Sequence, residues 1–257
     1  MKLSFFKYQG AGNDFVCFDN RQGEVKLTTE QIGRICDRRF GVGADGIIYL
    51  ERDPGYDFYV RYFNADGTQS LCGNGSRAAV DLAAHLKIVA ATTVFNAYDG
   101  PHEATLISPG LIRMQIHDVQ HVERKGEDYF VNTGSPHNVR FVTDLPHFPV
   151  FEEGRKIRYS PLYNPTGTNA NFVEPLPDNT IAFRIYERGV EEETLSSGTG
   201  ATACALAASM SGYYSPIRVR SRGGEFEVEF KKRQDGTFYD IYVTGPAKMV
   251  FQGSLEL

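Results

Sequence analysis

The pattern of hydrophobic and polar positions along the chain predicts a protein built mostly of β-strands. β-Branched and aromatic residues recur in short segments, and turn-forming residues separate these segments, which is typical of strands. The clearest examples are residues 47–51, 58–65, 181–189, 217–221, 226–230 and 239–245. Long helical repeats are absent from most of the sequence, so we expect only a few helices.

Three helices are expected. The first covers residues 29–38, with Thr28 or Thr29 as its N-cap. The other two follow glycine-containing turns and cover residues 74–86 and 199–211. Alanine, leucine and valine occur on all sides of these two helices, which is typical of a helix buried in a core. The sequence therefore predicts an α/β (α+β) protein with two units, each a barrel-like sheet of strands around one central helix.

The turns that precede the two buried helices resemble each other. Aligning Cys72 with Ser197 also aligns the glycines and the alanine-rich residues that follow. Upstream, the segment GAGNDFV at 10–16 resembles GTNANFV at 167–173. These matches indicate one unit that is present twice.

The duplication predicts two domains. The first is expected to cover residues 1–118, completed by a C-terminal strand at 246–257, and the second to cover residues 119–245. The polar segment HDVQHVERKGED suggests a linker near residues 115–130.

Composition excludes several classes of protein. The net charge is −5 and no basic residues cluster, so nucleic acid is not an expected partner. No apolar stretch approaches the roughly 18 residues of a membrane span, and the N-terminus lacks the apolar core of a secretion signal. The 4 cysteines form no CxxC pair, which favours a reducing compartment. We therefore expect a cytoplasmic protein without membrane partners.

Two motifs resemble ligand sites but are interpreted otherwise. GVGADG at 41–46 follows a predicted helix and precedes a predicted strand, the reverse of the order in a dinucleotide-binding site. We expect a tight helix-to-strand turn that needs a positive φ. His117 and His121 lie in a segment that does not read as a helix, so they are expected to be surface residues and no metal site is predicted.

The glycine turns give a stronger signal. A helix N-terminus presents backbone N–H groups and the positive end of a dipole, and glycine lets an anion approach closely. Two such turns suit the binding of one carboxylate. The same dipole favours a thiolate, so Cys72 is a candidate base. The other cysteines, Cys17, Cys36 and Cys204, are interpreted as inert core residues.

One group of reactions suits a base on each of two matching units. Removal of the α-proton of an amino acid requires a base on one face of the carbon, and the charge that develops must be stabilised. Return of a proton to the opposite face inverts the centre. A pair of similar helix ends can supply both steps without a cofactor, so no cofactor is expected.

The ordered motifs of the sequence resemble those of the diaminopimelate epimerase family, whose members epimerise an amino acid of the pathway to lysine and peptidoglycan without a cofactor. The resemblance extends over nearly the whole chain. The family fold has two similar α/β units around central helices, with the active site in a cleft between them. The matching motifs are GAGNDF (10–15), DRRFGVGADG (37–46), FNADG (63–67), CGNGSR (72–77), GSPHNV (134–139), NANFV (169–173), YERGVEEETL (186–195) and GTGA (198–201).

The resemblance also implies roles for individual residues. Cys72 matches the first catalytic cysteine, and His137 and Glu187 are implied in the catalytic chemistry. Backbone groups that hold the substrate carboxylate are implied at Gly73, Asn74, Gly198 and Thr199. Substrate-binding side chains are implied at Asn13, Asn64, Asn169, Glu187 and Arg188.

Ser197 departs from the family, because the second catalytic cysteine is expected at this position. Three interpretations stay open: a diaminopimelate epimerase whose second cysteine was changed to serine and whose activity is reduced, another epimerase or racemase that uses Cys72 and Ser197, or a dehydratase-like relative that needs one base. A non-catalytic amino-acid-binding protein is the alternative from another class. The expected partner is a small amino-acid substrate, and a homodimer is the expected assembly.

Overall fold

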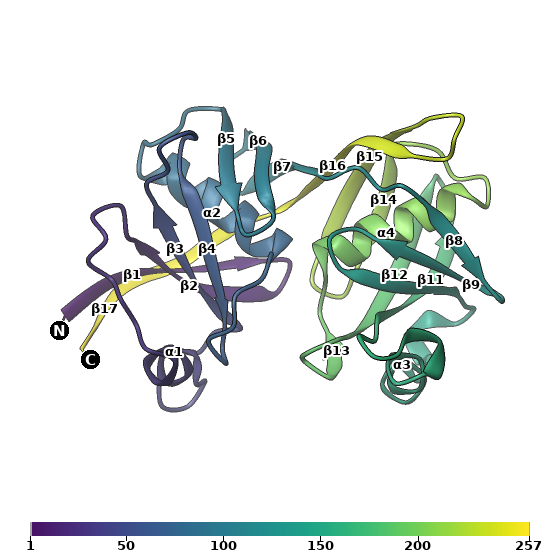
Figure 1. The fold of residues 1–257 in the computed structure, drawn as a ribbon, viewed down its shortest axis with the longest axis horizontal. Helices are drawn as coiled ribbons and strands as arrows, with labels where there is room; N and C mark the ends of the chain where they lie inside the picture. The colour runs from purple at the N-terminus through teal and green to yellow at the C-terminus, as the bar shows by residue number, and fades with distance from the viewer. Residues whose placement is uncertain (1, 257) are drawn as a thin grey trace. The chain divides into compact units, whose positions relative to one another are not determined.

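The computed structural model describes residues 2–256, and these residues form two compact units. Unit 1 contains the described residues up to Met114 together with those from Gly245 onward. Unit 2 is Gln115–Thr244. Figure 1 shows a helix surrounded by strands in each unit, as the sequence predicts.

In unit 1 the strands pair in the order β17–β1–β2–β3–β4–β5–β6–β7. The first strand lies beside the last (Figure 1). The strand bounds are β1 (Lys2–Gly10), β2 (Asn13–Asp19), β3 (Gly46–Glu51), β4 (Tyr59–Asn64), β5 (Thr92–Ala97), β6 (Gly100–Ser108), β7 (Leu111–Ile116) and β17 (Lys248–Glu256).

In unit 2 the order is β8–β9–β10–β11–β12–β14–β15–β16, and a short strand, β13 (Glu192–Thr194), pairs with β12. The other bounds are β8 (Val122–Lys125), β9 (Asp128–Asn132), β10 (Pro136–Phe141), β11 (Asn169–Leu176), β12 (Thr180–Glu187), β14 (Ile217–Arg220), β15 (Glu225–Lys232) and β16 (Phe238–Pro246).

The two series of strands have the same directions. Along each order the successive pairs are antiparallel, antiparallel, parallel, antiparallel, parallel, antiparallel and antiparallel. β3 of unit 1 therefore corresponds to β11 of unit 2, and β4 corresponds to β12. This agreement confirms the predicted pseudo-symmetry of two strand-built units.

Each sheet is covered by helices on both faces. The helix α2 (Gly73–His85) packs on strands of unit 1, and α4 (Gly198–Ser209) packs on the corresponding strands of unit 2. The opposite faces carry α1 (Thr29–Cys36) and α3 (Val150–Arg158), each packed against its own cluster of buried apolar side chains. Burial on both faces explains why a strand such as β3 is a nearly continuous apolar run.

The predicted helices and the predicted turn are present. α1 begins after Thr28, whose hydroxyl accepts a hydrogen bond from Gln31 N while the Gln31 side chain accepts from Thr28 N. The segment 41–46 connects α1 to β3, and Gly43 has a φ of 78°. It is therefore the helix-to-strand turn that the order of elements indicates.

Three expectations need correction. The sequence analysis missed α3, whose apolar residues Val150 and Ile157 face the core but lie among charged residues. The segment expected to be a linker, residues 115–130, contains β8 and the start of β9, because its valines and aromatic residues alternate around a turn at Gly126. Two 3₁₀ helices, Leu145–His147 and Pro161–Tyr163, were also not anticipated.

The upstream part of the repeat was aligned wrongly. Residues 10–16 run from the end of β1 into β2, whereas residues 167–173 lead into β11, which corresponds to β3. Both segments place a glycine before a buried Phe-Val pair, so the short similarity reflects the start of a strand and not equivalent positions. The alignment of Cys72 with Ser197 agrees with the topology, because each residue precedes the central helix of its unit.

None of the helices within residues 2–256 is long and apolar enough to cross a membrane.

Candidate active site

Cys72 is the N-cap of α2. It has an extended backbone, and its Sγ accepts a hydrogen bond from Gly75 N at 3.4 Å. The sulfur thus lies at the positive end of the helix dipole, next to the first-turn N–H groups of Gly73 and Asn74. A negative charge on this sulfur, or on a carboxylate beside it, is favoured by both features.

The Cys72 thiol also belongs to a polar cluster. Its S–H donates to Asn13 Oδ1 at 3.4 Å, and the amide of Asn74 donates to the same oxygen at 3.5 Å. Asn13 Nδ2 donates to Asp45 Oδ2 at 2.5 Å, and Asn74 Oδ1 accepts from the buried guanidinium of Arg77. The structure therefore brings together Asn13, Cys72 and Asn74, three of the predicted residues.

A set of ion pairs supports this cluster from the strand side. Asp14 accepts from Lys7 Nζ at 2.6 Å and from Arg38 Nη2 at 2.7 Å, and Arg38 also reaches Asp45 at 2.8 Å. The hydrogen bonds from Arg38 and Lys7 hold the pKa of Asp14 below its usual value despite the opposing effect of burial. The loop that carries Asp45 is thereby fixed to the start of β2, where Asn13 lies.

Ser197 has the equivalent position in unit 2. It is the N-cap of α4, and its Oγ accepts from Gly200 N at 3.1 Å. The first-turn N–H groups of Gly198 and Thr199 lie beside it at the positive end of the helix. Gly200 is required here, because a Cβ would lie 2.9 Å from Asn171 Oδ1 and 3.0 Å from the Cβ of Ser197.

Thr199 connects His137 to Ser197. Its Nε2 is 3.1 Å from Thr199 Oγ1, which in turn is 3.3 Å from Ser197 Oγ. Burial lowers the pKa of His137 to about 3, and the charge of Arg188 adds to this effect. The imidazole is therefore neutral at physiological pH.

The amide of Asn171 determines the tautomer of His137. Asn171 Nδ2 donates to Asn138 O at 2.7 Å and lies 3.2 Å from His137 Nδ1. Because an amide NH₂ can only donate, Nδ1 is the acceptor and the ring proton lies on Nε2, facing Thr199. His137 thus donates toward Thr199, and the Thr199 hydroxyl can donate to Ser197.

Asn169 occupies a supporting position. Its Nδ2 donates to Ser135 Oγ at 2.8 Å and to Pro136 O at 3.0 Å, and its Oδ1 accepts from Arg188 N at 2.8 Å. The guanidinium of Arg188 donates to Thr166 O at 3.2 Å. The Asn169 amide therefore joins the start of β10 to the turn after β12.

Glu187 and Asn64 lie at corresponding strand ends. Glu187 is the last residue of β12 and accepts from Thr194 Oγ1 at 2.8 Å. Asn64 is the last residue of β4, pairs with Gly46 on β3, and donates to Thr68 Oγ1 at 3.0 Å. In this structure its amide stabilises the turn that leads toward Cys72.

The remaining cysteines are buried, whereas Cys72 is half-buried. Burial raises the pKa of Cys36 to about 11 and raises the pKa values of Cys17 and Cys204 further. Their thiols are therefore protonated, in agreement with the prediction that they are inert. His117 and His121 are exposed, also as predicted.

Three residues of these clusters were not found from the sequence: Asp45, Arg77 and Asn171. Arg77 could have been predicted from the sequence, because a charged residue inside an otherwise apolar helix must be buried with polar partners. No pattern in the sequence points to Asp45 or Asn171. Their contacts depend on parallel pairing between strands that are distant in sequence.

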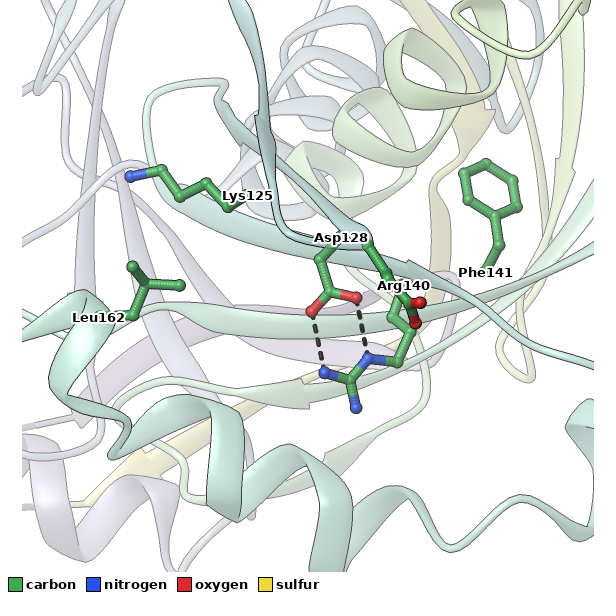
Figure 2. A pocket seen from close by; sticks show the side chains of 6 residues that line it. Lys125, Asp128, Arg140, Phe141 and Leu162 are labelled. Atoms are coloured by element: carbon green, nitrogen blue, oxygen red, sulfur yellow. Dashed lines mark hydrogen bonds and ion pairs between the residues drawn. The ribbon is translucent and has the colours of Figure 1, made fainter.

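A cavity of about 510 Å³ in unit 2 is lined by none of the predicted site residues, and Figure 2 shows side chains that line it. Two of its charged groups pair with each other: Arg140 donates from Nε and Nη2 to the two oxygens of Asp128, both at 2.9 Å. Asp128 also accepts from Asn138 at 2.9 Å. The clusters around Cys72 and Ser197 are therefore the better candidates.

Comparison with known proteins shows the family of the chain. Residues 5–122 and 129–250 match the model of the family described as diaminopimelate epimerase. The chain belongs to the diaminopimelate epimerase family. The two matched stretches include both helix N-termini, that of Cys72 and that of Ser197.

Curated members of the diaminopimelate epimerase family are similar over nearly their full length. The diaminopimelate epimerase of Flavobacterium psychrophilum is 46% identical over 257 residues, which cover 98% of this chain and 100% of the relative. That of Chlorobaculum tepidum is 40% identical, with coverage of 96% and 99%. These relatives support an amino-acid epimerase.

Solved structures show that the fold extends beyond the diaminopimelate epimerase family. A phenazine biosynthesis protein of the PhzF family from Bacillus anthracis has a TM-score of 0.76 at 15% identity and covers 100% of both chains. A hydroxyproline epimerase from Agrobacterium vitis has a TM-score of 0.74 at 12% identity and covers 100% of this chain and 93% of that one. At these identities the likeness shows the fold alone.

Proposed function

We propose that this chain epimerises LL-diaminopimelate to meso-diaminopimelate by proton transfer on two faces of the α-carbon, with Cys72 on one face and Ser197 on the other. The observation that carries the proposal is the equivalence of the two N-caps. Each side chain accepts from the backbone N–H of the glycine three residues further on, at 3.4 Å in unit 1 and 3.1 Å in unit 2.

The helix ends suit a substrate carboxylate and a transient negative charge. Removal of the α-proton spreads charge into the carboxylate, and backbone N–H groups at a helix N-terminus stabilise such charge. Gly73 with Asn74 and Gly198 with Thr199 supply these groups. The side chains of Asn13 and Arg188 would bind the remaining polar groups of the amino acid.

The two reacting side chains are not equivalent in acidity. A thiol of ordinary pKa about 8.5 is readily tuned to work as a base near neutral pH. A serine hydroxyl ionises far less readily and needs another group to activate it. Cys72 is therefore assigned the removal of the proton, and Ser197 is expected to return a proton slowly.

The experiment compares the chain that has Ser197 with its Ser197→Cys variant. Solvent deuterium entering the α-carbon reports proton removal, and conversion of LL- to meso-diaminopimelate reports inversion. We expect the Ser197 chain to exchange faster than it inverts, and Ser197→Cys to raise inversion by about 10² to 10⁴-fold, the usual contribution of a positioned acid–base group. Equal inversion rates in the two proteins would contradict reduced activity.

A second candidate function follows from the contacts of Ser197. His137 and Thr199 form a hydrogen-bonded chain to the serine, so the hydroxyl belongs to a polar relay. This favours an epimerase or racemase that uses Cys72 and Ser197 as its natural pair on a different amino acid. Exchange assays over a panel of amino acids distinguish this candidate, and exchange on none of them would favour a binding protein.

The predicted homodimer in the cytoplasm stays a prediction, and sedimentation would check the assembly.

A further inference from the structure

A chain of hydrogen bonds passes Cys72 and ends in a charged group on each side. At one end the buried Arg77 donates to Asn74 Oδ1. Asn74 Nδ2 then donates to Asn13 Oδ1 at 3.5 Å, and Asn13 Nδ2 donates to Asp45 Oδ2 at 2.5 Å. The Cys72 thiol joins this chain at Asn13 Oδ1.

The two charged ends fix the direction of every link. A guanidinium can only donate and an ionised carboxylate can only accept, so neither amide can rotate by 180° without losing its charged partner. Asn13 must therefore turn its oxygen, and not its NH₂ group, toward Cys72 Sγ. An acceptor in this position binds the protonated thiol and opposes the thiolate.

We propose that Arg77 and Asp45 are positioning residues that set the proton affinity of Cys72 from opposite directions. Asp45 holds the Asn13 oxygen against the S–H and so favours the thiol. Arg77 brings a buried positive charge to the first turn of the same helix and so favours the thiolate. The proposal rests on the proposed function only in that Cys72 is the reacting thiol.

The charge of Arg77 is shielded from solvent. Its side chain has no solvent exposure, and burial lowers its pKa to about 10, an effect that the negative charge of a Cys72 thiolate opposes. In low dielectric an opposite charge within a few ångströms is worth one or more pH units of proton affinity.

Within the described residues, unit 2 has no corresponding chain of hydrogen bonds with a charged group at each end. The position that matches Arg77 is Thr202, which is fully buried and whose hydroxyl donates to Gly198 O at 3.0 Å. The chain beside Ser197 consists of Thr199, the neutral His137 and Asn171, and none of these carries a charge. The charged chain therefore accompanies the thiol and not the hydroxyl.

Other ionisable groups near α2 must be considered when the proton affinity is measured. Lys7, Asp14 and Arg38 form the ion pairs behind Asp45. Tyr8 donates to Asp81 on α2 at 3.1 Å, and burial raises the pKa of Tyr8 well above its usual range. The elements packed on the helix also carry the buried Tyr62 and His102. The variants below leave all of these residues in place.

The test measures the rate of iodoacetamide alkylation of Cys72 against pH in the full chain, read from the Cys72 peptide by mass spectrometry. Asp45→Asn removes a charge and frees the Asn13 amide to turn its NH₂ toward the sulfur. We expect the pH midpoint to fall by about one unit. Arg77→Met removes the buried cation and should raise the midpoint by about one unit, and Arg77→Lys should restore it in part.

Asp37→Asn is the matched control. It makes the same change of charge next to Arg38, but the Asp37 carboxylate accepts from the backbone N–H groups of Arg39 and Phe40 and not from Asn13, so the midpoint should not move. Shifts of opposite sign for Asp45→Asn and Arg77→Met support the proposal, because general loosening of the structure would move both in one direction.

Two results would overturn the proposal: a midpoint that does not fall in folded Asp45→Asn, or midpoints that move together in the two variants. If Arg77→Met does not fold, Asp45→Asn decides alone, since the Asp45 side chain is 42% exposed and its replacement should be tolerated. The readout requires no epimerase activity, so failure of the proposed reaction is seen separately in the deuterium-exchange assay.

Discussion

The Thr199 hydroxyl lies between two groups of unequal character, 3.1 Å from Nε2 of His137 and 3.3 Å from Oγ of Ser197. Because Asn171 places the ring proton on Nε2, His137 donates to Thr199, and the Thr199 hydroxyl can then donate to Ser197. The Ser197 oxygen also accepts from Gly200 N. With two donors at its oxygen, Ser197 is left with its own proton to give, which suits a proton donor better than a base.

The first prediction tests this polarity with Thr199→Val, which keeps the shape and removes the hydroxyl. The link from His137 to Ser197 is lost, so inversion of the substrate should fall by about tenfold or more, as expected for loss of a hydrogen bond worth roughly 1.5 kcal/mol. Deuterium exchange through Cys72 should be retained. Thr199→Ser is the control and should behave as the unsubstituted chain. Equal losses of exchange and inversion would place Thr199 in binding alone.

The second prediction concerns acid stability. The imidazole of unfolded His137 takes up a proton below about pH 6.5, the ordinary value, whereas the folded side chain does so only at about pH 3. Between these two pH values the unfolded state binds more protons than the folded state. The contribution of His137 to the stability of the fold is therefore present at neutral pH and is lost as the pH falls. The free energy of unfolding should decline by up to about 1.4 kcal/mol per pH unit from this residue.

Denaturant unfolding at several pH values between 6.5 and 3 checks this slope. His137→Gln should show a shallower decline, whereas His121→Gln, which changes an exposed histidine, should match the unsubstituted chain. Identical slopes for all three proteins would mean that His137 is not held neutral by burial.

The third prediction uses the exposure of the thiols. Brief treatment of the folded protein with iodoacetamide should label Cys72 and spare Cys17, Cys36 and Cys204, because those three are buried and burial raises their pKa values. Peptide mass spectrometry measures the four labels separately. Preferential labelling of any buried cysteine would show that the environment of Cys72 has been misjudged.

Sequence reasoning found the two central helices because glycine turns and apolar runs are local signals. It missed α3 because only a few of its side chains face the core, among residues such as Glu152 and Lys156 that belong on a surface. Correct alignment of the repeat would have found it, since α3 lies between β10 and β11 as α1 lies between β2 and β3.

The residues of the candidate site also divide into those that local sequence signals predict and those that they do not. Cys72, Ser197 and their glycines are close in sequence to the helix ends that they cap, so their positions were predictable. The partners that orient them are not local. Asp45 reaches Asn13 because β2 and β3 run parallel, and Asn171 reaches His137 because β10 and β11 do. Which amide faces which group depends on this register, and the sequence alone does not determine it.

The last prediction compares how much room the two glycine turns leave for a Cβ atom, at Gly200 in one turn and at Gly73 in the other. At Gly200 a Cβ would lie 2.9 Å from Asn171 Oδ1, 3.0 Å from the Cβ of Ser197 and 3.2 Å from Ile185 Cδ1. The two shortest contacts cannot easily be relieved, because Asn171 is held by its hydrogen bond to Asn138 O and the Cβ of Ser197 is attached directly to the backbone. Gly200→Ala should therefore destabilise the fold by about 1 to 3 kcal/mol, the usual cost of overpacking a core.

Gly73→Ala is the contrasting variant in the first turn of α2, at the position that corresponds to Gly198 and not to Gly200. The nearest atom to its Cβ would be Met114 Cε at 3.8 Å, an ordinary contact. Its backbone is helical, so alanine should be neutral or should stabilise the fold by about 0.4 to 1 kcal/mol, because fewer conformations are open to the unfolded chain. Chemical denaturation of both variants measures the difference, and circular dichroism verifies that each is folded. If Gly73→Ala lost as much stability as Gly200→Ala, the packing at the two helix ends would be alike, and the close contact between Gly200 and Asn171 would not be what requires a glycine beside Ser197.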